Sequence, residues 1–240
     1  MTSTQKDPVL VILQLSGGND FMNTIIPYTN PLYYDNRPNV RISEDQVMPL
    51  NDELGFNPNM PEFKSLYEQG KVAIIQGVGY PKPNLSHFRS MDIWHTCEPE
   101  KLADEGWVGR AIRDLDPNKD NVLTGVNFGR GMPRAMAAPG VPVASVGNLE
   151  TYGVLTSIEV EQERAQALDI FSRMYSPAMG HGPVVDYLSQ TGMDALHGAD
   201  ILATAPGKYS STVEYGDSSM SQYMRNIAQV HIANLGTRIL

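Results

Sequence analysis

Two short polar stretches in the first third of the chain carry side chains that could work together in a reaction. In the first stretch, Asp20 follows Asn19 and a Gly-Gly pair, and Asn23 comes shortly after. In the second stretch, Ser86 stands beside His87, just before an amphipathic segment. A carboxylate can hold a divalent cation, and such a cation activates a nearby hydroxyl as a nucleophile. The pattern therefore indicates metal-assisted attack by a hydroxyl on an ester.

Both stretches follow segments that have the composition of buried strands. Residues 9–15 are apolar except for Gln14, and residues 71–78 form a second apolar run. A continuous apolar run closed by glycine is typical of a strand buried on both faces. A predicted helix over residues 62–68 lies between the two runs, which favours a right-handed parallel crossover. Functional groups of open α/β sheets lie beyond the carboxyl ends of the strands, so we expect Asp20 and Ser86 at the same sheet edge.

Each group has a role in this hypothesis. Asp20 is the expected metal ligand, while Ser86 and His87 are the expected catalytic residues. Asn19, Asn23 and Arg89 are expected to contact the substrate. The first turn of the helix after Ser86 offers backbone N–H groups that favour an anion such as phosphate or sulfate.

Simpler interpretations of the same residues stay open. Gly-Gly-Asn-Asp can be only a turn with Asx capping. Ser86 can be only a helix cap, which is the commoner role for a serine at such a position. Asp92 is expected to form an ion pair with Arg89 or a nearby cap rather than to take part in catalysis.

Several other kinds of site are not supported by the sequence. His95 and Cys97 lack a second pair of ligands at zinc spacing. No complete dinucleotide fingerprint, phosphate-binding loop or Gly-x-Ser-x-Gly elbow is present.

The bulk composition is that of an ordinary acidic globular protein. The chain has 240 residues, 41% of them hydrophobic, and a formal net charge of −9. An acidic chain lacks the basic face that binds nucleic acid, so no nucleic-acid partner is expected. No apolar run is long enough for a membrane span, and residues 1–8 lack the apolar core of a signal peptide. As written the chain is expected to be cytoplasmic, or periplasmic or secreted if an export signal is missing from it.

The remaining pattern predicts one α/β domain over residues 1–240. Residues 30–61 are expected to form an irregular surface excursion, with Tyr33 and Tyr34 packed beneath it. Helices are predicted after Ser86, after Gly106 and over residues 159–175, 184–196 and 218–234; strands over residues 121–128 and 141–146; and a loop over residues 198–217. Gly236 is expected to cap the last helix, and residues 237–240 to begin a strand. Because a domain rarely ends inside a core strand, we expect the chain to be the N-terminal part of something longer.

A family resemblance adds to these inferences. The stretches LQLSGGNDFMNTIIPY, YYDNRPNVRI, LGFNPNMPEFKSLYEQGKVAIIQGVGYPKPNLSHFRSMDIWHT and GWVGR look like the domain-of-unknown-function 1501 family. That family is regarded as part of the alkaline phosphatase/sulfatase-like superfamily. The resemblance implies a three-layer α/β sandwich with a mostly parallel central sheet. It also places Asp20 at a metal-ligand position and Ser86 at the nucleophile position.

The resemblance also has a gap. The later family motifs Gly-Gly-Phe-Asp-Thr-His and Thr-Asp-His-Gly, which are expected to supply further metal ligands, are absent from this sequence. The expected activity is therefore metal-dependent hydrolysis of a small phosphate or sulfate ester, with a site that is incomplete in this chain. The cation could be zinc, calcium, magnesium or manganese. The alternative is a non-catalytic binding or structural protein on a degenerate scaffold of the same fold.

Overall fold

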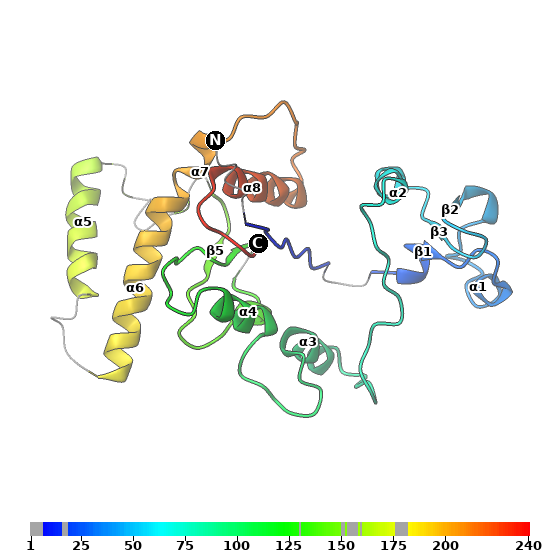
Figure 1. Cartoon of the computed structure of the whole chain (residues 1–240), viewed down its shortest axis with the longest axis horizontal. Helices are drawn as coiled ribbons and strands as arrows, with labels where there is room; N and C mark the ends of the chain where they lie inside the picture. The colour runs from blue at the N-terminus through cyan, green and yellow to red at the C-terminus, as the bar shows by residue number, and fades with distance from the viewer. Residues whose placement is uncertain are drawn as a thin grey trace. The chain divides into compact units, whose positions relative to one another are not determined.

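The chain folds into two compact units of mixed α/β structure (Figure 1). The computed structural model describes residues 7–15, 19–129, 131–149, 152, 158, 160–175 and 182–240, and the side chain of Glu161 lies outside this description. The small unit is Leu13–Gly79, and the large unit combines Met1–Ile12 with Tyr80–Leu240. The expectation of one domain over residues 1–240 stays a prediction.

The small unit has a short antiparallel sheet and its own core. Its elements are η1 (Phe21–Asn23), β1 (Ile25–Ile26), α1 (Pro31–Asp35), η2 (Glu44–Gln46), β2 (Met48–Pro49), β3 (Gly55–Phe56) and α2 (Pro61–Glu68). The strand order is β1-β3-β2. Ile26, Tyr33 and Val47 form the buried centre. The excursion predicted over residues 30–61 thus contains short regular elements. Tyr33 is buried, as expected. The helix predicted over residues 62–68 is confirmed by α2.

The large unit contains the longer helices and the parallel strands. Its elements are α3 (His87–Thr96), α4 (Trp107–Leu115), β4 (Val126–Phe128), η3 (Arg134–Met136), β5 (Ala144–Val146), α5 (Glu161–Met174), α6 (Pro183–Leu202), α7 (Ala205–Lys208) and α8 (Ser219–Ala233). In Figure 1, α5 and α6 lie side by side and α7 adjoins α8. The loop predicted over residues 198–217 is wrong at its start, because α6 continues to Leu202 and α7 follows.

Parallel backbone pairing joins the two ends of the chain to β4 and β5. Val126 of β4 lies opposite Ala144 of β5, and Ile239 forms parallel bridges with both Gly125 and Leu10. Backbone hydrogen bonds of 2.9 Å run from the Leu10 N–H to the Arg238 carbonyl and from the Leu240 N–H to the Leu10 carbonyl. The strand character predicted for residues 237–240 is therefore confirmed around Ile239.

Neighbouring residues of the C-terminal segment pack into different cores. Leu240 belongs to a cluster with Val126, Val146 and Val230, whereas Ile239 belongs to a cluster with residues of α4 and η3. Successive side chains of an extended segment point to opposite faces. This short segment therefore contributes to the apolar core on both of its sides.

Two predicted buried strands are not observed as such. Leu13 and Leu15 are 51% and 61% exposed, and the backbone pairing of this run with residues 238–240 involves only Leu10 and Ile12. Residues 71–78 form no strand, and Ile75 is 75% exposed. Gly77 has a positive φ of 67°, which interrupts the extended run. No described segment pairs with residues 71–78, so the burial predicted for both runs is wrong in this structure.

The end of α8 also differs from expectation. Asn234, with a φ of 54°, takes the left-handed conformation that ends the helix, instead of Gly236. Asparagine tolerates this left-handed conformation better than most residues, so Asn234 can end α8 in the role expected for Gly236. Among the described helices, none is long and apolar enough to cross a bilayer.

We expect Ile239→Ala to lower the free energy of unfolding by about 2–4 kcal/mol, because it leaves a cavity between the C-terminal segment and α4. The matched control is Ile232→Ala, since Ile232 on α8 is 44% exposed, and its expected cost is below about 1 kcal/mol. Urea unfolding of the two variants and the wild type measures both values. Equal losses for the two variants would contradict the central position assigned to Ile239.

Candidate functional site

The predicted site residues fall into two groups, one in each unit. Asn19, Asp20 and Asn23 belong to the small unit. Ser86 and its neighbours His87 and Arg89 belong to the large unit. The structure thus places each group within one unit, and the proximity of Asp20 to Ser86 stays a prediction.

Asp20 forms an ion pair through its side chain and accepts a hydrogen bond at its backbone carbonyl. Its carboxylate forms an ion pair with the guanidinium of Arg37, which also lies over the Tyr33 ring, 5.8 Å from the ring centroid. The Thr24 hydroxyl lies 3.0 Å from the Asp20 carbonyl oxygen and 3.4 Å from Asn19 Oδ1. The Asp20 side chain is 44% exposed, so the carboxylate is paired yet accessible.

Asn23 is committed to the fold of the small unit. Its Oδ1 accepts a hydrogen bond of 2.7 Å from the Tyr33 hydroxyl, and its Nδ2 donates one of 2.7 Å to the Val40 carbonyl. Its own carbonyl accepts from Asn57 Nδ2, also at 2.7 Å. Both polar atoms of the Asn23 side chain therefore have structural partners, and its expected contact with a substrate stays a prediction.

The surroundings of Asp20 do not form a metal centre by themselves. No cluster of three or more His, Cys, Asp or Glu side chains suited to a metal occurs among the described residues. Hard divalent cations require several oxygen ligands, usually with more than one carboxylate. Because Arg37 already pairs with Asp20, the residues described around Asp20 do not by themselves complete a site for a divalent cation.

The loop before α3 is a hydrogen-bonded turn that fixes Ser86. Asn84 Oδ1 accepts from the Ser86 N–H at 2.8 Å, and the Asn84 N–H donates to the Tyr80 hydroxyl at 3.2 Å. Ser90 Oγ lies 2.8 Å from the Tyr80 hydroxyl and donates to the Asn84 carbonyl at 2.7 Å. Tyr80, which sequence reasoning did not single out, thus ties the turn to the first part of α3.

Ser86 is the N-cap of α3, as predicted. Its Oγ accepts from the Arg89 N–H at 3.5 Å, and its backbone is extended with φ −74° and ψ 120°. Ser86 and His87 are both exposed. The first turn of this 10-residue helix presents backbone N–H groups and the positive end of the helix dipole to solvent beside the hydroxyl. Such an arrangement attracts an anion to Ser86.

Arg89 points away from the cap toward the loop after α3. Its Nη2 donates to three main-chain carbonyls, at 3.3, 3.1 and 2.9 Å, which belong to Glu98, Pro99 and Lys101. These bonds fold residues 98–101 back along the helix. The expected contact of Arg89 with a substrate stays a prediction, while its observed contacts position α3.

Arginines from later in the chain anchor the other end of α3. Arg134 of η3 forms an ion pair of 3.1 Å with Asp92 and donates to the Ala103 carbonyl at 2.6 Å. Arg110 of α4 donates to the Thr96 carbonyl at 2.9 Å. Asp92 thus has the structural ion pair that the sequence suggested, but with Arg134 as its partner. The sequence signal for this partner is weak because the contact is long-range.

The fold changes the pKa of His95 on α3. Partial burial lowers the pKa of His95 below its ordinary value of 6.5; the Asp92 carboxylate opposes this shift and the Arg134 guanidinium adds to it. The folded protein therefore disfavours a charged imidazole at this position.

Comparison of the chain with family models, with curated proteins and with solved structures finds no match.

We expect the stability of the protein to fall as the pH decreases from about 7 to about 5, in part through His95. The unfolded His95 takes up its proton near its ordinary pKa, whereas the folded one does so at lower pH. The unfolded state therefore binds more protons in this range, and acid favours it. His95→Gln should reduce this loss when urea unfolding is measured at both pH values.

The control for this experiment is His197→Gln, because His197 lies exposed on α6. It should leave the acid-induced loss as in the wild type. A loss in His95→Gln as large as in the wild type would show that the shifted pKa of His95 has no bearing on stability.

Proposed function

We propose that this chain carries part of the active site of a metal-dependent hydrolase that acts on small phosphate or sulfate esters, with Ser86 as the nucleophile. The observation that carries the proposal is the position of Ser86, whose hydroxyl lies exposed at the N-terminus of α3 within a hydrogen-bonded turn. A helix N-terminus favours the anionic group of such an ester. His87 is proposed to assist the reaction from the next position.

The fold that we propose is a three-layer α/β sandwich with a mostly parallel central sheet. Support comes from the parallel pairing of β4 and β5 and from the parallel bridges of Ile239 to Gly125 and Leu10. The separate clusters that contain Ile239 and Leu240 place α4 and α8 against different sides of this segment. The resemblance of the sequence to the domain-of-unknown-function 1501 family points to the same architecture.

In the proposed reaction, Ser86 Oγ forms a bond to the phosphorus or sulfur atom, and the bond to the alcohol of the ester breaks. The alcohol leaves with a proton, and water then releases phosphate or sulfate from Ser86. The anion would lie against the backbone N–H groups at the start of α3. Asn19, Asn23 and Arg89 are proposed substrate contacts because they are the polar or cationic side chains near Asp20 and Ser86 in the sequence.

A divalent cation would supply Lewis-acid activation in this class of enzyme. Asp20 is the ligand that this chain is proposed to contribute. The family motifs that are expected to supply further ligands are absent from the sequence, and Arg37 already pairs with Asp20. The proposal therefore requires ligands beyond the residues around Asp20.

The test is turnover of 4-nitrophenyl phosphate and 4-nitrophenyl sulfate by the protein that carries this sequence, with manganese or zinc added. Ser86→Asn keeps a capping oxygen at the start of α3 but removes the nucleophile. We expect it to lower kcat at least about a thousandfold, in line with the loss of a nucleophile.

The matched control is Ser65→Ala, because Ser65 lies exposed on α2 and should leave kcat unchanged. Ser86→Ala serves as a second comparison and should cost about 1 kcal/mol of stability through the lost cap. Turnover in Ser86→Asn equal to the wild type, or no turnover in the wild type, would reject Ser86 as a nucleophile.

A second candidate function is favoured by the pairing of Asp20 with Arg37. A carboxylate that is already neutralised suits a structural role, and Asn23 beside it is likewise used by the fold. In this alternative, the chain is a non-catalytic binding or structural protein on a degenerate scaffold of the hydrolase type.

Manganese binding separates the two candidates. If Asp20 is a ligand, Asp20→Asn should weaken Mn²⁺ binding at least about tenfold, as measured by isothermal titration calorimetry. Asp35→Asn, an exposed position in the same unit, should leave the affinity unchanged. Equal affinities in Asp20→Asn and the wild type, or no binding in any of the three proteins, would favour the non-catalytic alternative.

A further inference from the structure

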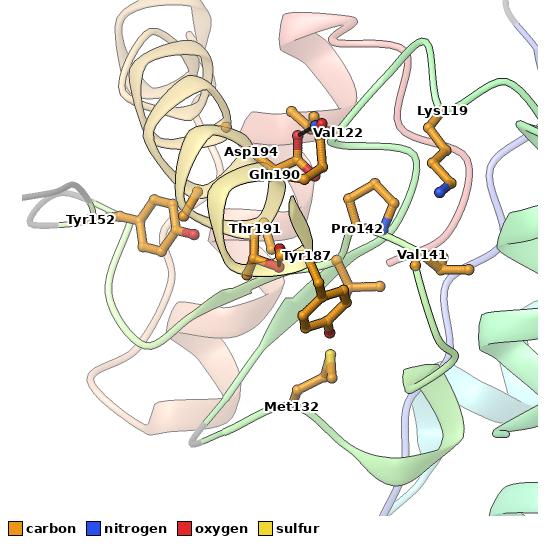
Figure 2. Close-up of a pocket in the computed structure, with 15 residues that line it drawn as sticks. Lys119, Val122, Met132, Val141, Pro142, Tyr152, Tyr187, Gln190, Thr191 and Asp194 are labelled. Carbon is orange, nitrogen blue, oxygen red and sulfur yellow. Dashed lines mark hydrogen bonds between the residues drawn. The ribbon is translucent and has the colours of Figure 1, made fainter. Parts of the chain in front are cut away.

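A cavity in the large unit lies between α6 and the loop before β5 (Figure 2). Its volume is about 350 Å³, which falls in the range of small-molecule sites. None of the residues proposed for ester hydrolysis lines it. The cavity is therefore a candidate ligand site separate from the site proposed at Ser86.

One side of the cavity is apolar. Val122, Val141, Pro142 and Val143 are among its apolar lining residues, and Figure 2 shows Pro142 between Lys119 and α6. Tyr187 of α6 also lines the cavity and is 57% exposed. An apolar surface opposite an accessible aromatic ring suits a flat, apolar ligand body.

Lys119 provides a cation at one end of this surface. Among the residues that the structure describes, no carboxylate lies within 4.0 Å of Lys119 Nζ. Lys119 Nζ is 3.2 Å from the position that a Cβ atom would take on Gly140. Gly140 has a positive φ of 69°, so both its conformation and its lack of a side chain let the ammonium approach.

The backbone of Lys119 is fixed by a carboxylate that caps its turn. Asp116 accepts from the Asp120 N–H at 2.9 Å, from the Asn121 N–H at 3.0 Å and from the Thr124 hydroxyl at 3.0 Å. Burial alone would raise the pKa of Asp116, but these donors and the Lys119 N–H lower it. The turn that carries Lys119 is therefore well braced at neutral pH.

Polar groups at the α6 side of the cavity can accept and donate hydrogen bonds. Gln190 Nε2 donates to Asp194 Oδ1 at 2.6 Å, and the other carboxylate oxygen of Asp194 can take a further donor. Tyr152 lines the cavity at the end opposite Lys119 in Figure 2. Burial raises the pKa of Tyr152, so its hydroxyl stays protonated and can donate.

We propose that this cavity binds a small aromatic carboxylate that also carries a hydroxyl group. The carboxylate pairs with Lys119, the ring lies between Pro142 and Tyr187, and the hydroxyl donates toward Asp194. The inference goes beyond the proposed ester hydrolysis and does not depend on Ser86.

The test uses 4-hydroxybenzoate as the probe and 4-hydroxybenzamide as its uncharged counterpart, with isothermal titration calorimetry on the whole chain. We expect 4-hydroxybenzoate to bind with a Kd of about 1 mM or tighter, and the amide to bind at least about fivefold more weakly. Lys119→Met should weaken 4-hydroxybenzoate by a similar factor, whereas Lys119→Arg should keep most of the affinity.

A control and a blocking variant complete the test. Lys208→Met changes an exposed lysine that does not line the cavity, and it should leave the Kd unchanged. Ala195→Trp places an indole in the cavity from an exposed position of α6 and should abolish binding. Absence of saturable binding, equal affinity for the amide, or unchanged affinity in Lys119→Met would each overturn the proposal.

Discussion

The large unit depends on the backbone pairing of its last residues on both sides. The Ile239 N–H donates to the Thr124 carbonyl at 3.0 Å, and the Ile239 carbonyl accepts from the Val126 N–H at 3.0 Å. On the other side, the Leu240 carbonyl accepts from the Ile12 N–H at 2.8 Å. Buried backbone groups must be paired, so this segment holds the N-terminal residues on one side and β4 on the other.

The same segment positions the helix that carries Ser86, through a series of contacts. Ile239 packs in one cluster with Ile112 of α4 and Met136 of η3. Arg134 of η3 then holds Asp92 of α3. The N-terminus of α3 is thus connected to the parallel backbone ladder by side chains rather than by a long continuous element, which explains why several arginines gather around this helix.

The sequence predicted correctly some features that depend on residues close together in the chain, such as a helix N-cap and a helix start. The cap at Ser86 and the start of a helix after Gly106 follow from nearby residues, and both agree with the structure. The apolar composition of residues 9–15 predicted burial but could not identify the residues that would cover them, and residues 10–15 are exposed here while Val9 is partly buried. The ion pair of Asp20 with Arg37 could not be predicted from the sequence either, because only the folding of the small unit brings these two residues together.

The most direct test of the central claim is to look for a covalent intermediate on Ser86. The protein that carries this sequence is incubated with 4-nitrophenyl phosphate and manganese or zinc, quenched in acid and digested, and its peptides are examined by mass spectrometry. The account predicts one phosphoryl group on Ser86 that disappears when the substrate is exhausted. A phosphoryl group on His87 instead, or none on the peptide that contains both residues, would contradict it.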